Sequence, residues 1–218
     1  AEDVIDKQQH VTLGAPFLKE GESFFDVSGA WRKVYPREFS KDMRLKAGEE
    51  FEWPDAPGAN GDTIDLRAYP MGKKTSDFTV TLATEGRKWA WFTAVNVKKG
   101  VVIGYVWPRK VWPWIANWEE NRSRAGTPWS RKAIARGIEF GTSPWPDPRR
   151  DQVTANRLNG TLMYRWIAAK ETQTVGYAAF VAPIPAGTTG VSDVNIDGSR
   201  IVVALQGVEK KLSLPFRR

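Results

Sequence analysis

The sequence predicts an all-β protein, a sandwich or barrel built from many strands with few or no helices. Several runs alternate apolar with polar residues, which is the pattern of a strand with one buried face. Two apolar runs are separated by a short loop that ends in Gly100, as in a β-hairpin. The 14 prolines and 19 glycines fit the loops of such a fold. Many strands with few helices indicate a sandwich or barrel.

The strand pattern can be followed along the chain. Residues 78–84, "FTVTLAT", place their threonines on one face and apolar residues on the other. The hairpin joins residues 89–97 to residues 101–107, and Gly100 accepts the positive φ that such a loop needs. Further strands are expected at residues 22–27, 161–169, 172–182, 200–205 and 208–214.

Two segments depart from the strand pattern. Residues 36–46 are expected to form a short helix. Residues 50–65, "EFEWPDAPGANGDTID", resemble a linker but are too short to separate two domains. They are therefore expected to form a long loop, and the sequence predicts a single β-sandwich domain over residues 1–218.

The composition excludes several classes of protein. The 218 residues are 41% hydrophobic and contain no cysteine, which excludes a disulfide framework, a thiolate nucleophile and a zinc–cysteine site. No apolar run is long enough to span a membrane, and the polar first residues carry no signal-peptide core. Either the protein is not exported or a signal has been removed, so a soluble protein of the cytoplasm or the periplasm is expected.

The net charge of +7 has more than one interpretation. It is compatible with a nucleic acid or an anionic polysaccharide as partner. It is also compatible with a solvated surface that has no partner. The basic residues are scattered along the chain and form no run typical of an interaction tail, which favours the solvated surface.

Tryptophan is unusually frequent. Six of the 11 tryptophans fall between residues 107 and 145. Indole rings favour half-buried positions with a polar partner, and their flat faces suit the C–H faces of sugars as well as nucleic-acid bases. Any one of these rings can simply belong to the core. For the cluster as a whole, we expect that some ring faces a ligand.

Proton-transfer chemistry has two candidate groups. His10 is the only histidine, and its ordinary pKa lets it give or take protons near neutrality. With one histidine and no cysteine, a transition-metal site is not expected. Glu139 lies between Ile138 and Phe140, which are expected to desolvate it and to raise its pKa, whereas nearby Arg136 opposes that shift.

The surroundings of Glu139 give further expectations. Gly137 and Gly141 are expected to leave open space that a ligand could occupy. Glu119 and Glu120 follow Trp118, and an alternating strand points one of the two carboxylates inward. A buried glutamate paired with an arginine is the structural alternative for Glu139. No nucleophile elbow, phosphate-binding loop or dinucleotide fingerprint occurs.

Two segments resemble the galactose mutarotase-like (aldose 1-epimerase) superfamily, as a divergent branch of it. "QQHVTLGAPFLKEG", residues 8–21, is similar to the central histidine strand of that family, and residues 112–147, "WPWIANWEENRSRAGTPWSRKAIARGIEFGTSPWPD", are similar to its later part. The resemblance implies a large twisted β-supersandwich with an open sugar cleft. It implies interconversion of aldose anomers with His10 as general acid, Glu139 as general base and no metal or organic cofactor.

The resemblance also carries expectations about ligand and completeness. The residues expected to bind the sugar or oligosaccharide are Trp118, Glu120, Arg122, Trp129 and Trp145. Family members have a long β segment before the central histidine, so this chain is expected to match the C-terminal portion of a longer fold. An exposed sheet edge would then be covered by that segment, by a partner chain or by a homodimer.

Two other functions stay open at this point. A non-catalytic carbohydrate-binding β-sandwich would keep the fold and the tryptophans. A nucleic-acid binder would need an aromatic strand or an alternating basic–aromatic groove, and the prolines and glutamates of the tryptophan cluster suit it poorly. Catalysis separates from binding on one point, because it requires His10 and Glu139 to face the same cleft, with space for a pyranose ring between them.

Overall fold

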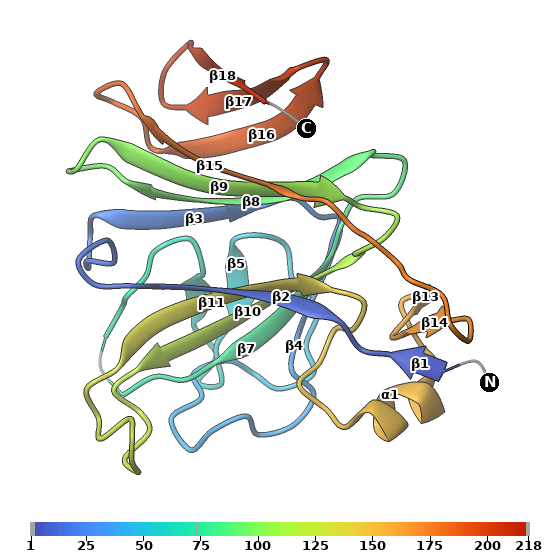
Figure 1. Ribbon diagram of the computed structural model, residues 1–218. Helices are drawn as coiled ribbons and strands as arrows, with labels where there is room; N and C mark the ends of the chain where they lie inside the picture. Colours follow the sequence, from blue (N-terminus) through green and yellow to red (C-terminus); the bar gives the residue numbers. More distant parts are fainter. Residues whose placement is uncertain (1–2, 73, 217–218) are drawn as a thin grey trace.

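The computed structural model describes residues 3–72 and 74–216. Strands make up 47% of the structure and helix 3%, which confirms the predicted all-β class. The described residues contain one short helix, α1 (Arg149–Ala155). Three antiparallel sheets lie one above the other and form the body of the molecule (Figure 1).

Two of these sheets form a sandwich. The five-stranded sheet has the order β2 (Gln8–Gly14), β11 (Ile134–Gly141), β10 (Trp114–Asn121), β7 (Phe78–Leu82) and β4 (Trp31–Val34). The four-stranded sheet has the order β15 (Ala178–Pro183), β9 (Val101–Pro108), β8 (Trp89–Asn96) and β3 (Ser23–Val27). Their facing sides bury an aromatic-rich core in which Trp107 stacks on Phe140, with ring centroids 3.9 Å apart.

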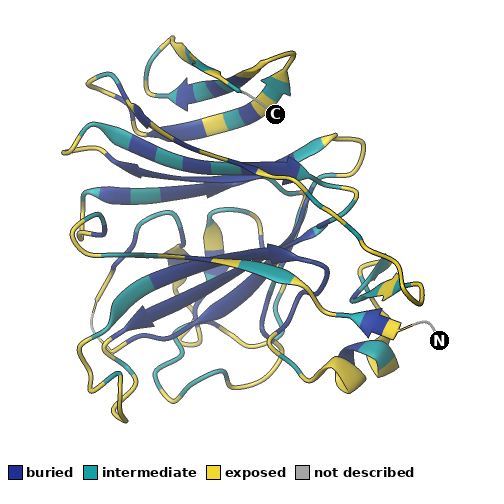
Figure 2. Ribbon diagram, viewed as in Figure 1, coloured by how far each residue is buried: buried dark blue, intermediate teal, exposed yellow. Residues whose placement is uncertain are grey.

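A third sheet covers the other side of the four-stranded sheet. It consists of β16 (Gly190–Asp197), β17 (Arg200–Gln206) and β18 (Lys211–Pro215), drawn in orange and red at the top of Figure 1. Its apolar side chains pack with those of β8, β9 and β15 in a second core. Because β8 has a core on each side, almost its whole length is buried, as Figure 2 shows.

Smaller elements connect the sheets. Three two-stranded ribbons pair β1 (Asp3–Ile5) with β14 (Arg165–Ile167), β5 (Asp55–Pro57) with β6 (Thr63–Asp65), and β12 (Arg157–Leu158) with β13 (Thr161–Leu162). The segment 50–65 is therefore part loop and part ribbon, and it packs on its own apolar cluster. The expected strand at 161–169 is interrupted, because it contributes to two different ribbons.

The helix expected at residues 36–46 is wrong. This segment forms turns and extended chain. The amide nitrogens of Arg44 and Leu45 donate to the Asp77 carboxylate, at 2.7 and 3.3 Å, where a helix would direct them to its own carbonyl oxygens. The hairpin is confirmed, because β8 and β9 pair through a turn in which Gly100 has φ +64°.

β10 and β11, two of the three inner strands of the five-stranded sheet, differ from the edge strand β2. β10 and β11 are buried along almost their whole length, whereas β2 is partly exposed (Figure 2). β2 is the edge strand, and among the described residues it pairs with β11 alone. None of the described residues forms a helix that is long and apolar enough to cross a membrane.

Candidate functional site

Strand pairing brings His10 and Glu139 together. In the register of β2 and β11, His10 lies directly opposite Glu139, and Thr12 lies opposite Gly137. Gly137 in turn lies opposite Trp118 of β10. Because alternate residues of a strand share a face, these side chains all project from the outer face of the sheet, away from the four-stranded sheet.

A cavity of about 450 Å³ opens on this outer face. Its wall is mostly aromatic and apolar, with the imidazole, one carboxylate, one hydroxyl and one guanidinium as its polar groups. The lining residues are His10, Thr12, Phe39, Phe78, Trp118, Arg124, Trp129, Ala135, Glu139 and Pro146. An apolar cavity with a few convergent polar groups is typical of a small-molecule site.

His10 is held from both sides of its ring. Its Nε2 lies 3.1 Å from Oε1 of Glu139, and its Nδ1 lies 3.0 Å from Oγ1 of Thr12. The His10 side chain is 47% exposed, while that of Glu139 is 9% exposed. The hydrogen bond with Glu139 raises the pKa of His10 above its usual 6.5; partial burial opposes the shift, and the charge of Glu139 adds to it.

Gly137 allows this arrangement. A Cβ atom at this position would lie 2.9 Å from Cε1 of His10 and 3.0 Å from Cε3 of Trp118. The two rings use the space, and they meet edge to face with centroids 6.0 Å apart. The expectation of open space for a ligand is therefore wrong for Gly137, because protein side chains fill it. At Gly141 the main chain of Lys7 and Gln8 fills it in the same way.

The expectation that Ile138 and Phe140 surround the Glu139 carboxylate is also wrong. Ile138 and Phe140 point to the opposite face of the strand and belong to the core between the two sheets. Arg136 points the same way and contacts Glu119, at 3.4 Å. Neighbours along a strand lie on opposite faces, so the surroundings of Glu139 are set by β2 and β10 instead.

The aromatic wall is fixed by the loop between β10 and β11. Trp118 and Trp129 meet edge to face at 5.7 Å, and the Arg124 guanidinium lies 5.2 and 5.0 Å from their ring centroids. Glu120 holds this loop, since its Oε1 accepts hydrogen bonds from the amides of Ser123 and Arg124, at 2.8 and 3.0 Å. Its side chain is fully buried.

The predicted binding residues thus divide into two groups. Trp118 and Trp129 line the cavity with His10 and Glu139. Glu120, Arg122 and Trp145 do not line it: Glu120 holds the loop, Arg122 is exposed on it, and Trp145 packs in the core against Tyr35 and Phe78.

Sequence reasoning did not assign several lining residues to the site. Thr12 had a signal, because it lies two residues after His10 and therefore on the same face of β2. Phe78 lies opposite Trp118, in a register that the pairing of β7 with β10 sets. Arg124 lies in the loop that follows β10. Phe39 and Pro146 come from loops, where no periodicity indicates direction.

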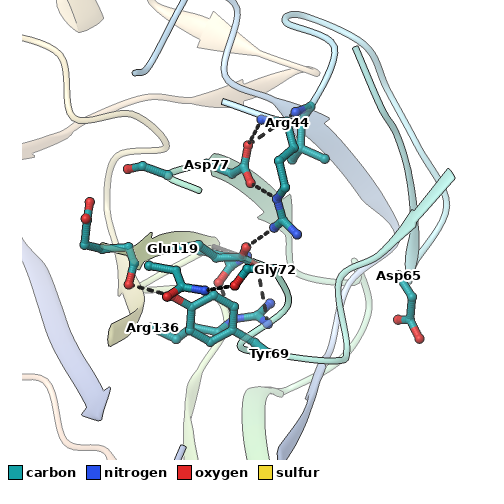
Figure 3. A network of polar contacts seen from close by, with 12 residues as sticks. Arg44, Asp65, Tyr69, Gly72, Asp77, Glu119 and Arg136 are labelled. Carbon is teal, nitrogen blue, oxygen red and sulfur yellow. Dashed lines mark hydrogen bonds and ion pairs between the residues drawn. The ribbon is translucent and has the colours of Figure 1, made fainter. Parts of the chain in front are cut away.

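The inner face of the same strands carries a buried ionic network (Figure 3). Arg136 Nε donates to Asn117, at 2.6 Å, and Glu119 lies between the guanidinium groups of Arg136 and Arg44. Arg44 also donates to Asp77, at 2.6 Å. Two arginines and two carboxylates balance in charge, as burial of charge requires.

Aromatic rings complete this network. Nη1 and Nη2 of Arg136 have no hydrogen-bond partner among the described residues. Its guanidinium instead lies 4.3 Å from the ring centroid of Phe25 and 5.6 Å from that of Tyr69. The Tyr69 hydroxyl donates to the Glu120 carbonyl oxygen, at 2.6 Å. The network therefore anchors β10 and β11, the strands that carry Trp118 and Glu139.

In the part of the chain that the structure describes, no group of three or more histidine, cysteine, aspartate or glutamate side chains is placed to hold a metal ion. The polar groups that line the His10 cavity are the His10–Glu139 pair, the Thr12 hydroxyl and the Arg124 guanidinium.

Comparison with known proteins gives one match. No family model and no curated protein matches the sequence. Among solved structures, the chain is similar to the crystal structure of a "putative aldose 1-epimerase" from Klebsiella pneumoniae subsp. pneumoniae, with a TM-score of 0.49 and 15% sequence identity. The match covers 80% of this chain and 36% of that chain, so the chain spans about a third of the length of the protein it matches.

Proposed function

We propose that the cavity of His10 and Glu139 binds an aldose and interconverts its anomers by general acid–base catalysis. The observation that carries the proposal is the contact of the two groups: strands far apart in the sequence place the only imidazole 3.1 Å from a carboxylate, at an aromatic-lined cavity of about 450 Å³. Such a pair can exchange protons with a ligand at neutral pH.

The short distance between the two groups suits this reaction. The hydroxyl oxygen and the ring oxygen of a cyclic aldose are bonded to the same anomeric carbon. The acid and the base must therefore stand side by side. The expectation of space for a pyranose ring between them is wrong, because Nε2 of His10 and Oε1 of Glu139 lie 3.1 Å apart, and the reaction does not need the two groups to flank the ring. The sugar would lie over the pair, with its apolar face toward Trp118 or Trp129.

The proton transfers balance over one cycle. The Glu139 carboxylate takes the proton of the anomeric hydroxyl, and protonated His10 gives a proton to the ring oxygen from Nε2. The bond between the anomeric carbon and the ring oxygen breaks, and an aldehyde forms. After rotation about the adjacent carbon–carbon bond, the ring closes on the other face: His10 takes its proton back and Glu139 returns the other. The raised pKa of His10 favours the protonated form that starts the cycle.

The test measures anomer interconversion by polarimetry on freshly dissolved α-galactose and α-glucose, in dilute buffer. His10→Asn removes the acid and Glu139→Gln removes the base, and each should lower the enzymatic rate by roughly 10²-fold or more. Glu49→Gln, at an exposed glutamate outside the cavity, is the matched control and should keep the full rate. Wild-type rates in both site variants would refute the catalytic assignment.

A non-catalytic carbohydrate-binding module is the second candidate. Two observations favour it: His10 and Glu139 already contact each other, and the cavity wall is mostly aromatic and apolar. This function predicts that galactose or an oligosaccharide shifts the tryptophan fluorescence while the wild-type protein leaves the anomer interconversion at its buffer rate. Saturable sugar binding without any acceleration of anomer interconversion would favour the non-catalytic carbohydrate-binding module.

A further inference from the structure

A second cavity, of about 460 Å³, lies at the opposite end of β10 and β11 from the His10 cavity. Pro113, which precedes β10, and Thr142, which follows β11, line it together with the ribbons β12–β13 and β14. It shares no lining residue with the His10 cavity. Four of its lining residues are cationic and none is acidic; the cations are Arg109, Lys110, Arg157 and Arg165.

Main-chain carbonyl oxygens hold the three arginines in place. Arg165 Nη1 donates to the carbonyl oxygens of Lys110 and Val111, at 3.4 and 3.1 Å. Arg157 Nη1 donates to Gly160, at 2.7 Å, and Arg109 Nε donates to Ala83, at 3.2 Å. A guanidinium has five N–H donors, so each side chain is oriented and keeps other donors for a ligand.

The positive charge of this cavity is largely uncompensated. Within the described ranges, Glu85 is the only carboxylate that pairs with one of the four cations, 3.4 Å from Arg109 Nη2, and its side chain is 81% exposed. Elsewhere in the molecule buried arginines meet carboxylates, as Arg44 and Arg136 do. Three oriented arginines and Lys110 around a concave space with no acidic lining residue would attract an anionic group.

An aromatic ring stands beside these cations. Trp166 is 51% exposed although it lines the cavity, and it meets Tyr164 edge to face with centroids 5.9 Å apart. An exposed indole at a binding cavity offers an apolar face for the C–H face of a sugar ring. Cations and an indole side by side match a ligand that has a ring and an acidic substituent.

We propose that this second cavity binds an anionic saccharide: the arginines and Lys110 take its carboxylate, sulfate or phosphate group, and Trp166 takes its ring. A nucleic acid is less well matched, because the four cations line one cavity, whereas proteins that bind single strands follow the backbone with a positively charged groove. The site is independent of the reaction proposed for His10 and Glu139.

Titration calorimetry at low ionic strength tests this site with chemically defined probes. Trigalacturonate carries carboxylates, a chondroitin sulfate disaccharide carries sulfate, and glucose 6-phosphate carries phosphate; maltotriose is the neutral control. We expect saturable binding of at least one anionic sugar, no binding of maltotriose, and weaker binding at physiological salt because the Debye length falls to about 8 Å.

Charge-matched variants locate the ligand. The double variant Lys110→Gln/Arg157→Gln should weaken binding roughly tenfold or more, the loss expected for one charge-assisted hydrogen bond or more. Lys210→Gln/Lys211→Gln removes the same charge at exposed positions of the third sheet and should change affinity much less. Lys110→Gln alone leaves the Arg157–Gly160 contact intact and covers the case in which the double variant unfolds.

Several results would overturn the proposal. Equal binding of maltotriose would show that the anionic group is not recognised. Unchanged affinity in Lys110→Gln and in the double variant would show that the ligand does not bind in this cavity. Loss of binding in His10→Asn would move the ligand to the His10 cavity. Tighter binding of an oligothymidylate, lost in the same variants, would assign the site to a nucleic acid instead.

Discussion

The two faces of β11 carry charged residues with opposite surroundings. On the inner face, Arg136 meets Glu119 in the core, and neither side chain has more than 1% exposure. On the outer face, Glu139 meets His10, whose side chain is 47% exposed and lines a cavity. Both contacts join a basic side chain to a carboxylate, yet only the outer contact leaves space beside the reactive atoms.

This difference separates a structural charge pair from a candidate site. The inner charges are enclosed by other charges, amides and aromatic rings, so they have no route to a ligand (Figure 3). Burial raises the pKa of Glu119 and lowers that of Arg136, so burial in the core is sufficient to cause both shifts. A perturbed pKa therefore indicates a site in this protein only where a cavity accompanies it.

The largest expected effect compares Glu119→Gln with Glu139→Gln, the same chemical change on opposite faces. Glu119→Gln leaves two arginines without their shared carboxylate in the core, so the free energy of unfolding should fall by about 3–5 kcal/mol. Glu139→Gln breaks a contact with a half-exposed partner and should cost about 1 kcal/mol or less. Urea denaturation followed by tryptophan fluorescence measures both.

Equal losses for the two variants would contradict this comparison. In that case the outer pair would be as structural as the inner pair, and the loss of anomer interconversion in Glu139→Gln would no longer indicate catalysis. A loss in activity with little loss in stability at Glu139, and the reverse at Glu119, would sharpen the distinction between the two faces.

A middle-sized effect is expected from Gly137→Ala. The added methyl group lies 2.9 Å from the His10 ring, so the ring must move away from Glu139 or the strands must separate. Overpacking of this kind typically costs about 1–3 kcal/mol. Gly14→Ala on the neighbouring edge strand β2 is the control, because its Cβ would meet the nearest atom at an ordinary 3.5 Å. Thermal melts and polarimetry of both variants provide the test.

One result for Gly137→Ala would contradict the role of Gly137 in positioning His10. If its stability and its rate of anomer interconversion both match those of Gly14→Ala, the His10 ring does not depend on the space above Gly137. The close packing of His10 and Trp118 would then have no role in positioning the imidazole.

The fold was predictable where a strand has one polar face or a clear turn. The hairpin of β8 and β9 follows from two apolar runs and Gly100. The segment 36–46 was not predictable in this way, because its amides are held by Asp77, a residue far along the chain. Residues in such loops obey tertiary contacts more than local propensity.

The site was predictable only in part. A family resemblance and the chemistry of the two side chains predicted His10 and Glu139 as site residues. Their contact depends on the register of β2 with β11, which cannot be derived from the sequence alone. The argument from Ile138 and Phe140 was wrong because alternation sends them to the other face. The same alternation could have placed Thr12 beside His10.

The smallest effect concerns the protonation of His10, and the single histidine makes it directly measurable. Its imidazole proton signals in NMR belong to one residue, so their pH titration gives its pKa without assignment. We expect a midpoint above 6.5 in the wild type, because Glu139 stabilises the protonated ring. Glu139→Gln should lower the midpoint clearly, whereas Thr12→Val should change it less, because it keeps the carboxylate.

The same shift sets the sign of a small pH dependence in stability. The folded-state pKa of His10 is raised above the unfolded value, so its contribution is complete below about pH 6.5 and is lost as the pH rises through the folded-state pKa. Because the ring is half-exposed, the contribution should stay below about 1 kcal/mol. The stability difference between the wild type and Glu139→Gln should therefore shrink from about pH 6 to pH 9. A difference that grows over this range, or a wild-type midpoint at or below that of Glu139→Gln, would mean that the carboxylate does not stabilise the imidazolium in solution.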